Sequence, residues 1–173
     1  MQFEIEFKAD HLNRVMEAVR REIATPQEML GSMGESLLRV NRERHDKGLA
    51  PDGTKWKELS KLTLAQGKRK GGPLNRTGDL LNSFHYQVTG NALVLGFDSA
   101  FEAKKAVWHH FGTDPYTIRP KHKAVLAFAG IVAKRVNHPG LPARPLVGFP
   151  VSDQKLVADI TADHLIRVLN RVR

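Results

Sequence analysis

The sequence predicts an α+β fold, in which a small, mostly antiparallel sheet packs with a long N-terminal helix and further helices. Apolar side chains recur at helical spacing through residues 12–40 and again after residue 152. Residues 86–97 instead alternate apolar and polar side chains on both sides of Gly90-Asn91, which is the pattern of a β-hairpin. Helices and hairpins in this order along the chain are typical of α+β proteins.

The N-terminal part predicts a strand followed by two helices. Residues 3–7 alternate apolar side chains with glutamates, as in a half-buried strand. We expect Asp10 to cap the first helix, and Thr25 with Glu28 to form a capping box at the start of the second. The second helix extends through a polar run and ends at Gly48.

Residues 48–73 predict a mobile loop that contains one helical turn near residues 60–66. The segment is rich in glycine and lysine and has a single large aromatic residue, Trp56, which can anchor it by burying its ring. A loop of this length inside a compact domain is usually functional or disordered. After it, Thr77 is expected to cap a short helix that carries Leu80, Leu81 and Phe84.

The C-terminal half predicts two helices that flank short strands. Ser99 and Glu102 form a capping box for a helix that Gly112 ends. Residues 124–129 and 131–136 predict short strands that can pair across a glycine, and Ser152 is expected to cap the final helix. We interpret residues 1–173 as one domain.

The net charge of +9 is unevenly distributed. Residues 39–76 carry a net charge of +7, and residues 115–152 carry six basic residues and no acidic one. This pattern indicates either an acidic or phosphate-bearing neighbour or a solvated basic surface. The chain has no cysteine, which excludes disulfides and thiolate metal sites. We expect no membrane association, because no apolar stretch of about 18 residues occurs and the N-terminus lacks the apolar core of a signal peptide.

No catalytic or metal-binding motif is apparent, so we expect neither enzymatic activity nor a cofactor. His109 and His110 are adjacent, and neighbours on a helix point about 100° apart, so this pair does not easily share a metal. Gly71-Gly72-Pro73 is not followed by the Lys and Ser/Thr of a phosphate-binding loop, and Ser83 lacks the glycines of a nucleophile elbow.

Several short blocks in a fixed order resemble the phage virion morphogenesis family, also called tail-completion proteins. They cover residues 48–149 and comprise Pro51-Asp52-Gly53-Thr54-Lys55-Trp56, then Leu74, Thr77, Gly78, Leu80 and Ser83, then His109, Phe111 and Gly112, and lastly Pro142-Ala143-Arg144-Pro145. The chain departs from the family pattern around Trp108-His109-His110, where Ala more often precedes the histidine and Gln follows it.

The resemblance implies a structural virion protein, assembled in the host cytoplasm, that acts in tail completion or head–tail joining. Its expected partners are the tail tube, the connector and further copies of itself in a ring, with non-specific contact to DNA as an additional expectation. We expect the partner-binding residues to be Lys55, Trp56, Lys68, Arg69, Lys70, Arg76 and Arg144. Arg144 can pair with a carboxylate inside the fold or across a subunit boundary. The alternative function is a basic nucleic-acid-binding module, supported by the two basic segments and Trp56.

Overall fold

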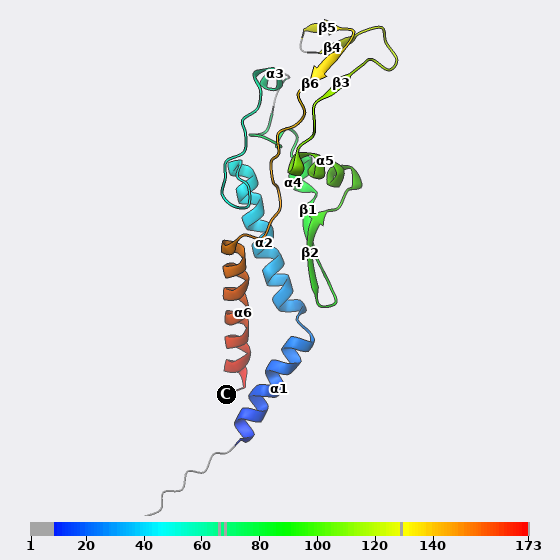
Figure 1. Ribbon diagram of the computed structural model, residues 1–173. Coiled ribbons are helices and arrows are strands. Elements are labelled where there is room, and N and C mark those ends of the chain that lie inside the picture. Colours follow the sequence, from blue (N-terminus) through cyan, green and yellow to red (C-terminus); the bar gives the residue numbers. More distant parts are fainter. Residues whose placement is uncertain (1–8, 66, 68, 129, 173) are drawn as a thin grey trace, which may run out of the picture.

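The computed structural model describes residues 9–65, 67, 69–128 and 130–172. About 48% of the chain is helical and 17% is in strands, and the sheets are small and antiparallel, so the predicted α+β class is confirmed. Figure 1 shows an elongated molecule with long helices at one end and short strands at the other. The strand predicted at residues 3–7 lies outside the described residues.

Three long helices form the lower part of the molecule. They are α1 (Asp10–Ala24), α2 (Gln27–Lys47) and α6 (Val151–Arg171), and α6 packs against both of the others. The predicted end of α2 is confirmed, because Gly48 adopts a left-handed conformation with φ of 68°. A residue without Cβ adopts this conformation at little cost.

The three predicted caps of these helices are wrong. Asp10 is the first residue of α1 rather than its cap, and no side chain caps that end. The hydroxyl of Thr25 donates back to the Arg21 carbonyl over 3.0 Å and so completes the last turn of α1, leaving α2 to begin after Pro26. Ser152 lies inside α6, where its hydroxyl accepts from the Arg44 guanidinium at 3.2 Å. The hydroxyls of Thr25 and Ser152 thus form hydrogen bonds with other groups and do not cap the following helices.

The predicted hairpin is confirmed and packs on α2. Strand β1 (Phe84–Thr89) pairs with β2 (Ala92–Phe97), and both strands contact α2. Gly34 of α2 lies directly against the ring of Tyr86, and a Cβ added at Gly34 would lie 2.3 Å from Tyr86 Cδ2. The helix and the hairpin approach this closely only because residue 34 has no side chain.

Three shorter helices connect these elements. They are α3 (Lys61–Leu64), α4 (Asp79–Asn82) and α5 (Ala100–Phe111). The turn predicted at residues 60–66 contains α3, and the predicted Ser99 cap of α5 is confirmed, since its hydroxyl accepts from Glu102 N at 3.4 Å. Thr77 does not cap α4: Gly78 takes the cap position, and the Thr77 hydroxyl donates to the Asp79 carboxylate over 2.7 Å. Phe84, which we assigned to that helix, belongs to β1.

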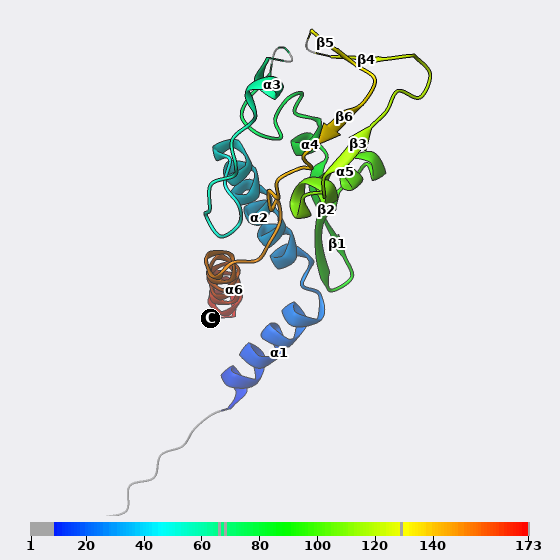
Figure 2. The same ribbon diagram turned by 45° about the horizontal axis from the view of Figure 1, so that its top comes forward.

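Residues 115–138 form a projecting arm of two small sheets. Strand β3 (Tyr116–Ile118) pairs with β6 (Val136–His138), and β4 (Leu126–Phe128) pairs with β5 (Ile131–Ala133). The pairing of β4 with β5 was predicted, whereas the pairing of β3 with β6 was not. At the base of the arm, a Cβ added at Gly140 would lie 2.1 Å from the Thr113 carbonyl oxygen, so the two chain passages touch there. Figure 2 shows the arm extending away from the long helices.

Candidate assembly surface

The basic loop, residues 55–76, is anchored to the body by Trp56. The Trp56 side chain is only 5% exposed, and its indole N–H donates to the Pro145 carbonyl over 3.0 Å. Its ring meets the His45 ring edge to face, with centroids 5.4 Å apart. The preceding turn is ordered as predicted: Gly53 has φ of 87°, and the Asp52 carboxylate accepts from Thr54 N at 2.9 Å. Trp56 therefore fixes where the basic loop begins.

Arg144 holds the start of the basic loop, just after Trp56, against the body. It is 4% exposed, and its guanidinium donates to the Lys57 carbonyl over 2.8 and 3.1 Å and to the Glu58 carbonyl over 3.3 Å. Its backbone N–H donates to the His109 carbonyl at the end of α5 over 2.7 Å. Burial lowers the pKa of Arg144. Arg144 thus joins segments of its own chain through backbone carbonyls inside the fold, and not through a carboxylate, which the sequence had suggested either inside the fold or across a subunit boundary.

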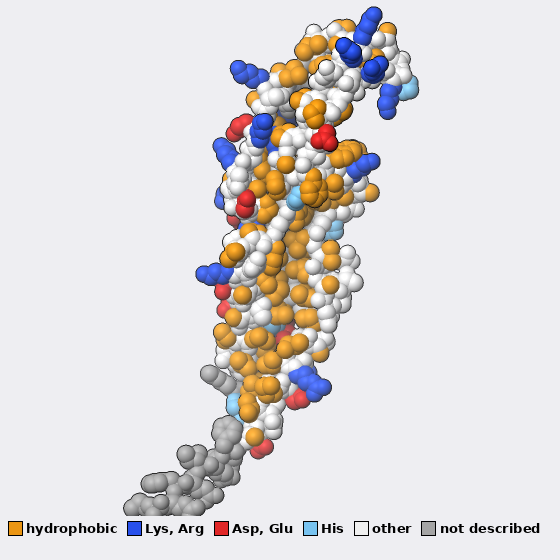
Figure 3. Space-filling model, viewed as in Figure 1, with side chains coloured by type: hydrophobic (Ala, Val, Ile, Leu, Met, Phe, Trp, Pro, Cys, Tyr) orange, Lys and Arg blue, Asp and Glu red, His pale blue; other side chains and the backbone are white. Residues whose placement is uncertain are grey.

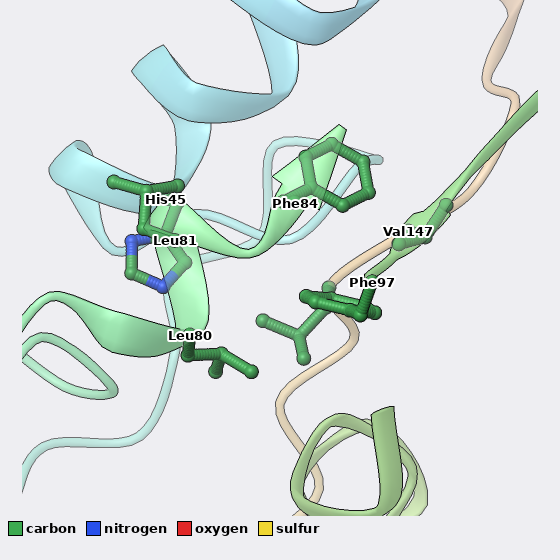
Figure 4. Close-up of a pocket in the computed structure, with 7 residues that line it drawn as sticks. His45, Leu80, Leu81, Phe84, Phe97 and Val147 are labelled. Carbon is green, nitrogen blue, oxygen red and sulfur yellow. The ribbon is translucent and has the colours of Figure 1, made fainter. Parts of the chain in front are cut away.

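His45 is a core histidine beside this anchor. Figure 4 shows it among Leu80, Leu81 and Phe84, around an apolar cavity of about 10 Å³. A cavity of this size has room for roughly one water molecule. Within the part of the chain that the structure describes, neither ring nitrogen of His45 has a hydrogen-bond partner. Burial lowers the pKa of His45, which favours the neutral imidazole.

The exposed part of the predicted site consists of cations on the basic loop. Lys55, Lys70 and Arg76 are exposed, and Lys55 pairs with Glu58 at 3.5 Å. Lys70 N donates to the Arg76 carbonyl over 3.2 Å, which places these two residues opposite each other across a turn. Arg69 is half-buried, and Lys68 lies outside the described residues. The structure therefore separates the six described residues of the predicted site into the buried anchors Trp56 and Arg144, the half-buried Arg69, and the exposed cations Lys55, Lys70 and Arg76.

One ion pair and one histidine–carboxylate contact between helices were missed by the sequence reasoning. The guanidinium of Arg44 on α2 binds both carboxylate oxygens of Asp153, which is 1% exposed near the start of α6. The hydrogen bonds to Asp153 raise the pKa of Arg44. On α1, Glu22 lies 2.6 Å from His164 Nε2 of α6. These contacts hold α6 against both preceding helices, and nothing in the local sequence pairs residues that are so far apart.

The described residues contain no group of three or more histidine, cysteine or acidic side chains that could hold a metal ion. None of their helices is both long and apolar enough to cross a membrane. His109, which we considered as a ligand, has a pKa lowered by burial and by the nearby charges of Arg144 and Lys105.

Comparison with known families identifies the chain. A model of the phage virion morphogenesis family matches residues 7–166. The chain belongs to this family. The sequence resemblance is thereby confirmed over a longer range than the blocks that suggested it, and it gives this family member a structural role in building the virion. Searches of curated proteins and of solved structures found no significant match.

Proposed function

We propose that this virion morphogenesis protein acts in tail completion or head–tail joining as a ring-forming subunit. The observation that carries the proposal is a pair of different apolar surfaces on opposite sides of an elongated subunit. Figures 1 and 2 both place α5 and α6 on opposite sides of α2. The family membership supports the virion context in which such a subunit assembles.

The first surface is the α5 face, formed by Phe101, Trp108 and Phe111. These side chains are 68%, 45% and 75% exposed, although each is large and apolar. Lys104 lies 5.3 Å from the centroid of the Trp108 ring, and Lys105 lies 4.9 Å from that of Phe101. Exposed aromatic clusters are typical of protein contact surfaces, where Trp and Tyr supply much of the binding energy.

The second surface is the α6 face, formed by the side chains that point away from α1 and α2. Its large apolar members Val151, Ile166 and Leu169 are 78%, 53% and 37% exposed, and Ala158 and Ala162 lie exposed between them. Small residues on a helix allow another element to approach its backbone closely. The α6 face is therefore suited to receive protruding side chains such as those of the α5 face.

Two different surfaces on opposite sides favour head-to-tail association. When one surface of a subunit binds the other surface of the next, the contact is heterologous and repeats around a ring if the rotation closes. In this arrangement the basic loop and the arm lie outside the ring contacts. The basic loop remains free to meet other virion proteins, with the tail tube and the connector as the proposed partners.

Cysteine cross-linking in assembled particles tests the ring contact, because the chain has no cysteine of its own. A Trp108→Cys/Ala162→Cys double variant should form a ladder of disulfide-linked multimers after mild oxidation. The matched control, Trp108→Cys alone, should give no species larger than a dimer. If the double variant assembles into particles without forming a ladder, the proposed contact between the α5 and α6 faces is wrong.

Charge reversal tests the basic loop as a surface for other virion proteins. Replacing the three exposed loop cations Lys55, Lys70 and Arg76 by Glu should leave the fold intact, because exposed charges contribute little to stability. It should nevertheless leave heads and tails unjoined, or tails with irregular ends. The control variant reverses three exposed arginines on the long helices, Arg14, Arg20 and Arg171, and should give normal particle yield. Normal yield from the folded loop variant would show that the loop is not an assembly surface.

The alternative function remains a basic nucleic-acid-binding module, favoured by the net positive charge of residues 39–76 and 115–152. The two functions differ in their genetic result. A module that only binds nucleic acid is not required for joining heads to tails, whereas a completion protein is.

A further inference from the structure

The arm carries a concentrated positive charge that the function proposed above does not use. Residues 115–138 contain five Lys/Arg residues and no acidic residue. All five basic side chains are exposed: Arg119, Lys121, Lys123, Lys134 and Arg135. Figure 3 shows Lys and Arg side chains gathered at this end of the molecule.

The strand pairing brings these five cations together. Ile118 pairs with Val136, and Leu126 pairs with Ala133, so residues 119–125 and 134–135 connect the same two strand pairs. All five cations lie on these two connections between the small sheets. The fold thus places charges from two parts of the sequence on the same arm.

The arm has almost no core that could hold its shape in isolation. None of its described residues is buried, and its strands contact mainly each other. An isolated two-stranded sheet is marginally stable in water, so a partner that packs on the arm would stabilise it. At its base, Gly112 and Gly140 allow the two chain passages to touch, which fixes the point where the arm leaves the body.

We propose that the arm binds the phosphate backbone of duplex DNA through Arg119, Lys121, Lys123, Lys134 and Arg135. A surface of one charge sign suits DNA, because interfaces with DNA are far more positively charged than those between proteins. Contacts between proteins are instead usually depleted of lysine in their centre. The competing partner is an acidic protein surface. Such a partner would pair with the arm's cations and cover the exposed apolar side chains of Ile131 and Val132 at the arm's tip. The proposal does not depend on ring formation.

Fluorescence anisotropy with a labelled duplex of about 30 base pairs tests this site in the isolated full-length protein. Five phosphate contacts predict that log K falls with log salt concentration with a slope of about −4 to −5. The arm variant replaces all five cations by Gln and should weaken binding at least about a hundredfold near physiological salt, because it removes those contacts. Circular dichroism should show the same secondary structure as in the unmodified protein.

Two control variants make the assignment specific. The first replaces five exposed cations on the long helices by Gln, which changes the net charge equally: Arg14, Arg20, Lys155, Arg167 and Arg171. It should retain affinity within about threefold, since non-specific binding depends on the phosphates actually contacted. The second replaces the three arm lysines by Arg, which keeps their charge, and should also retain affinity.

The proposal is overturned if the unmodified protein does not bind the duplex, if the arm variant binds as well as the unmodified protein, or if both Gln variants lose affinity equally. The last result would mean that overall charge, and not the arm, attracts DNA. Tighter binding to poly-L-glutamate than to the duplex at equal salt would assign the arm to an acidic protein instead.

Discussion

Replacing Trp56 by Ala should strongly destabilise the protein, because Trp56 anchors the basic loop. The substitution removes a ring that is 5% exposed, and truncating a buried tryptophan costs about 3–5 kcal/mol. It also removes the hydrogen bond to the Pro145 carbonyl, with a net contribution of about 1 kcal/mol. Because the loop can partly relax into the space, we expect a total loss of about 4 kcal/mol, which corresponds to a fall in Tm of about 8–16 °C for a chain of this size.

The other tryptophan provides a matched control. Trp108 is 45% exposed, so Trp108→Ala should change the free energy of unfolding by less than about 1 kcal/mol. Urea unfolding followed by far-ultraviolet circular dichroism measures both variants. Equal stability losses in the two variants would refute the conclusion that Trp56 anchors the basic loop, as would a Trp56→Ala variant as stable as the unmodified protein.

Three further substitutions test other parts of the fold. Gly34→Val should cost at least about 2 kcal/mol in urea unfolding, because the valine side chain would collide with the Tyr86 ring. The control Gly31→Val, in open space on the same helix, should cost less than about 1 kcal/mol. Equal costs for the two variants would contradict the close packing of Gly34 on Tyr86. Burial lowers the pKa of His45, so its stabilising contribution is present above the unfolded value of about 6.5 and is lost as the pH falls below it. His45→Phe should therefore reduce the loss of stability between about pH 7.5 and 5.5, and an unchanged pH dependence would show that His45 is not responsible. Thr77→Ala should cost less than about 0.5 kcal/mol, since among the described residues the Thr77 hydroxyl donates only to the exposed Asp79 carboxylate. A loss of about 1 kcal/mol or more would restore Thr77 as a helix cap.

Local patterns predicted most of the secondary structure. The apolar spacing of the long helices, the Gly90-Asn91 hairpin and the stops at Gly48 and Gly112 each depend on residues close together in the sequence. Helix caps were less predictable, because a hydroxyl can accept from several donors. Ser152 illustrates this, since its hydroxyl accepts from Arg44, which lies far away in the sequence on the adjacent helix α2.

The internal contacts of the candidate site could not be predicted for a related reason. Arg144 is held by backbone carbonyls, which every residue offers and which therefore leave no mark in the sequence. The pairing of β3 with β6 joins strands of three residues that are about 20 positions apart, too short to show an alternating pattern. The sequence predicted the important segments, but their division into buried anchors and exposed cations depends on tertiary packing.

Electron microscopy of lysates from a phage that lacks a working copy of this gene tests the central claim most directly. If the protein completes the tail or joins it to the head, the lysate should contain DNA-filled heads and separate tails, the latter with irregular ends. Supplying the protein from a plasmid should restore joined, infectious particles. Normal numbers of joined particles in its absence would contradict the proposed role in tail completion or head–tail joining.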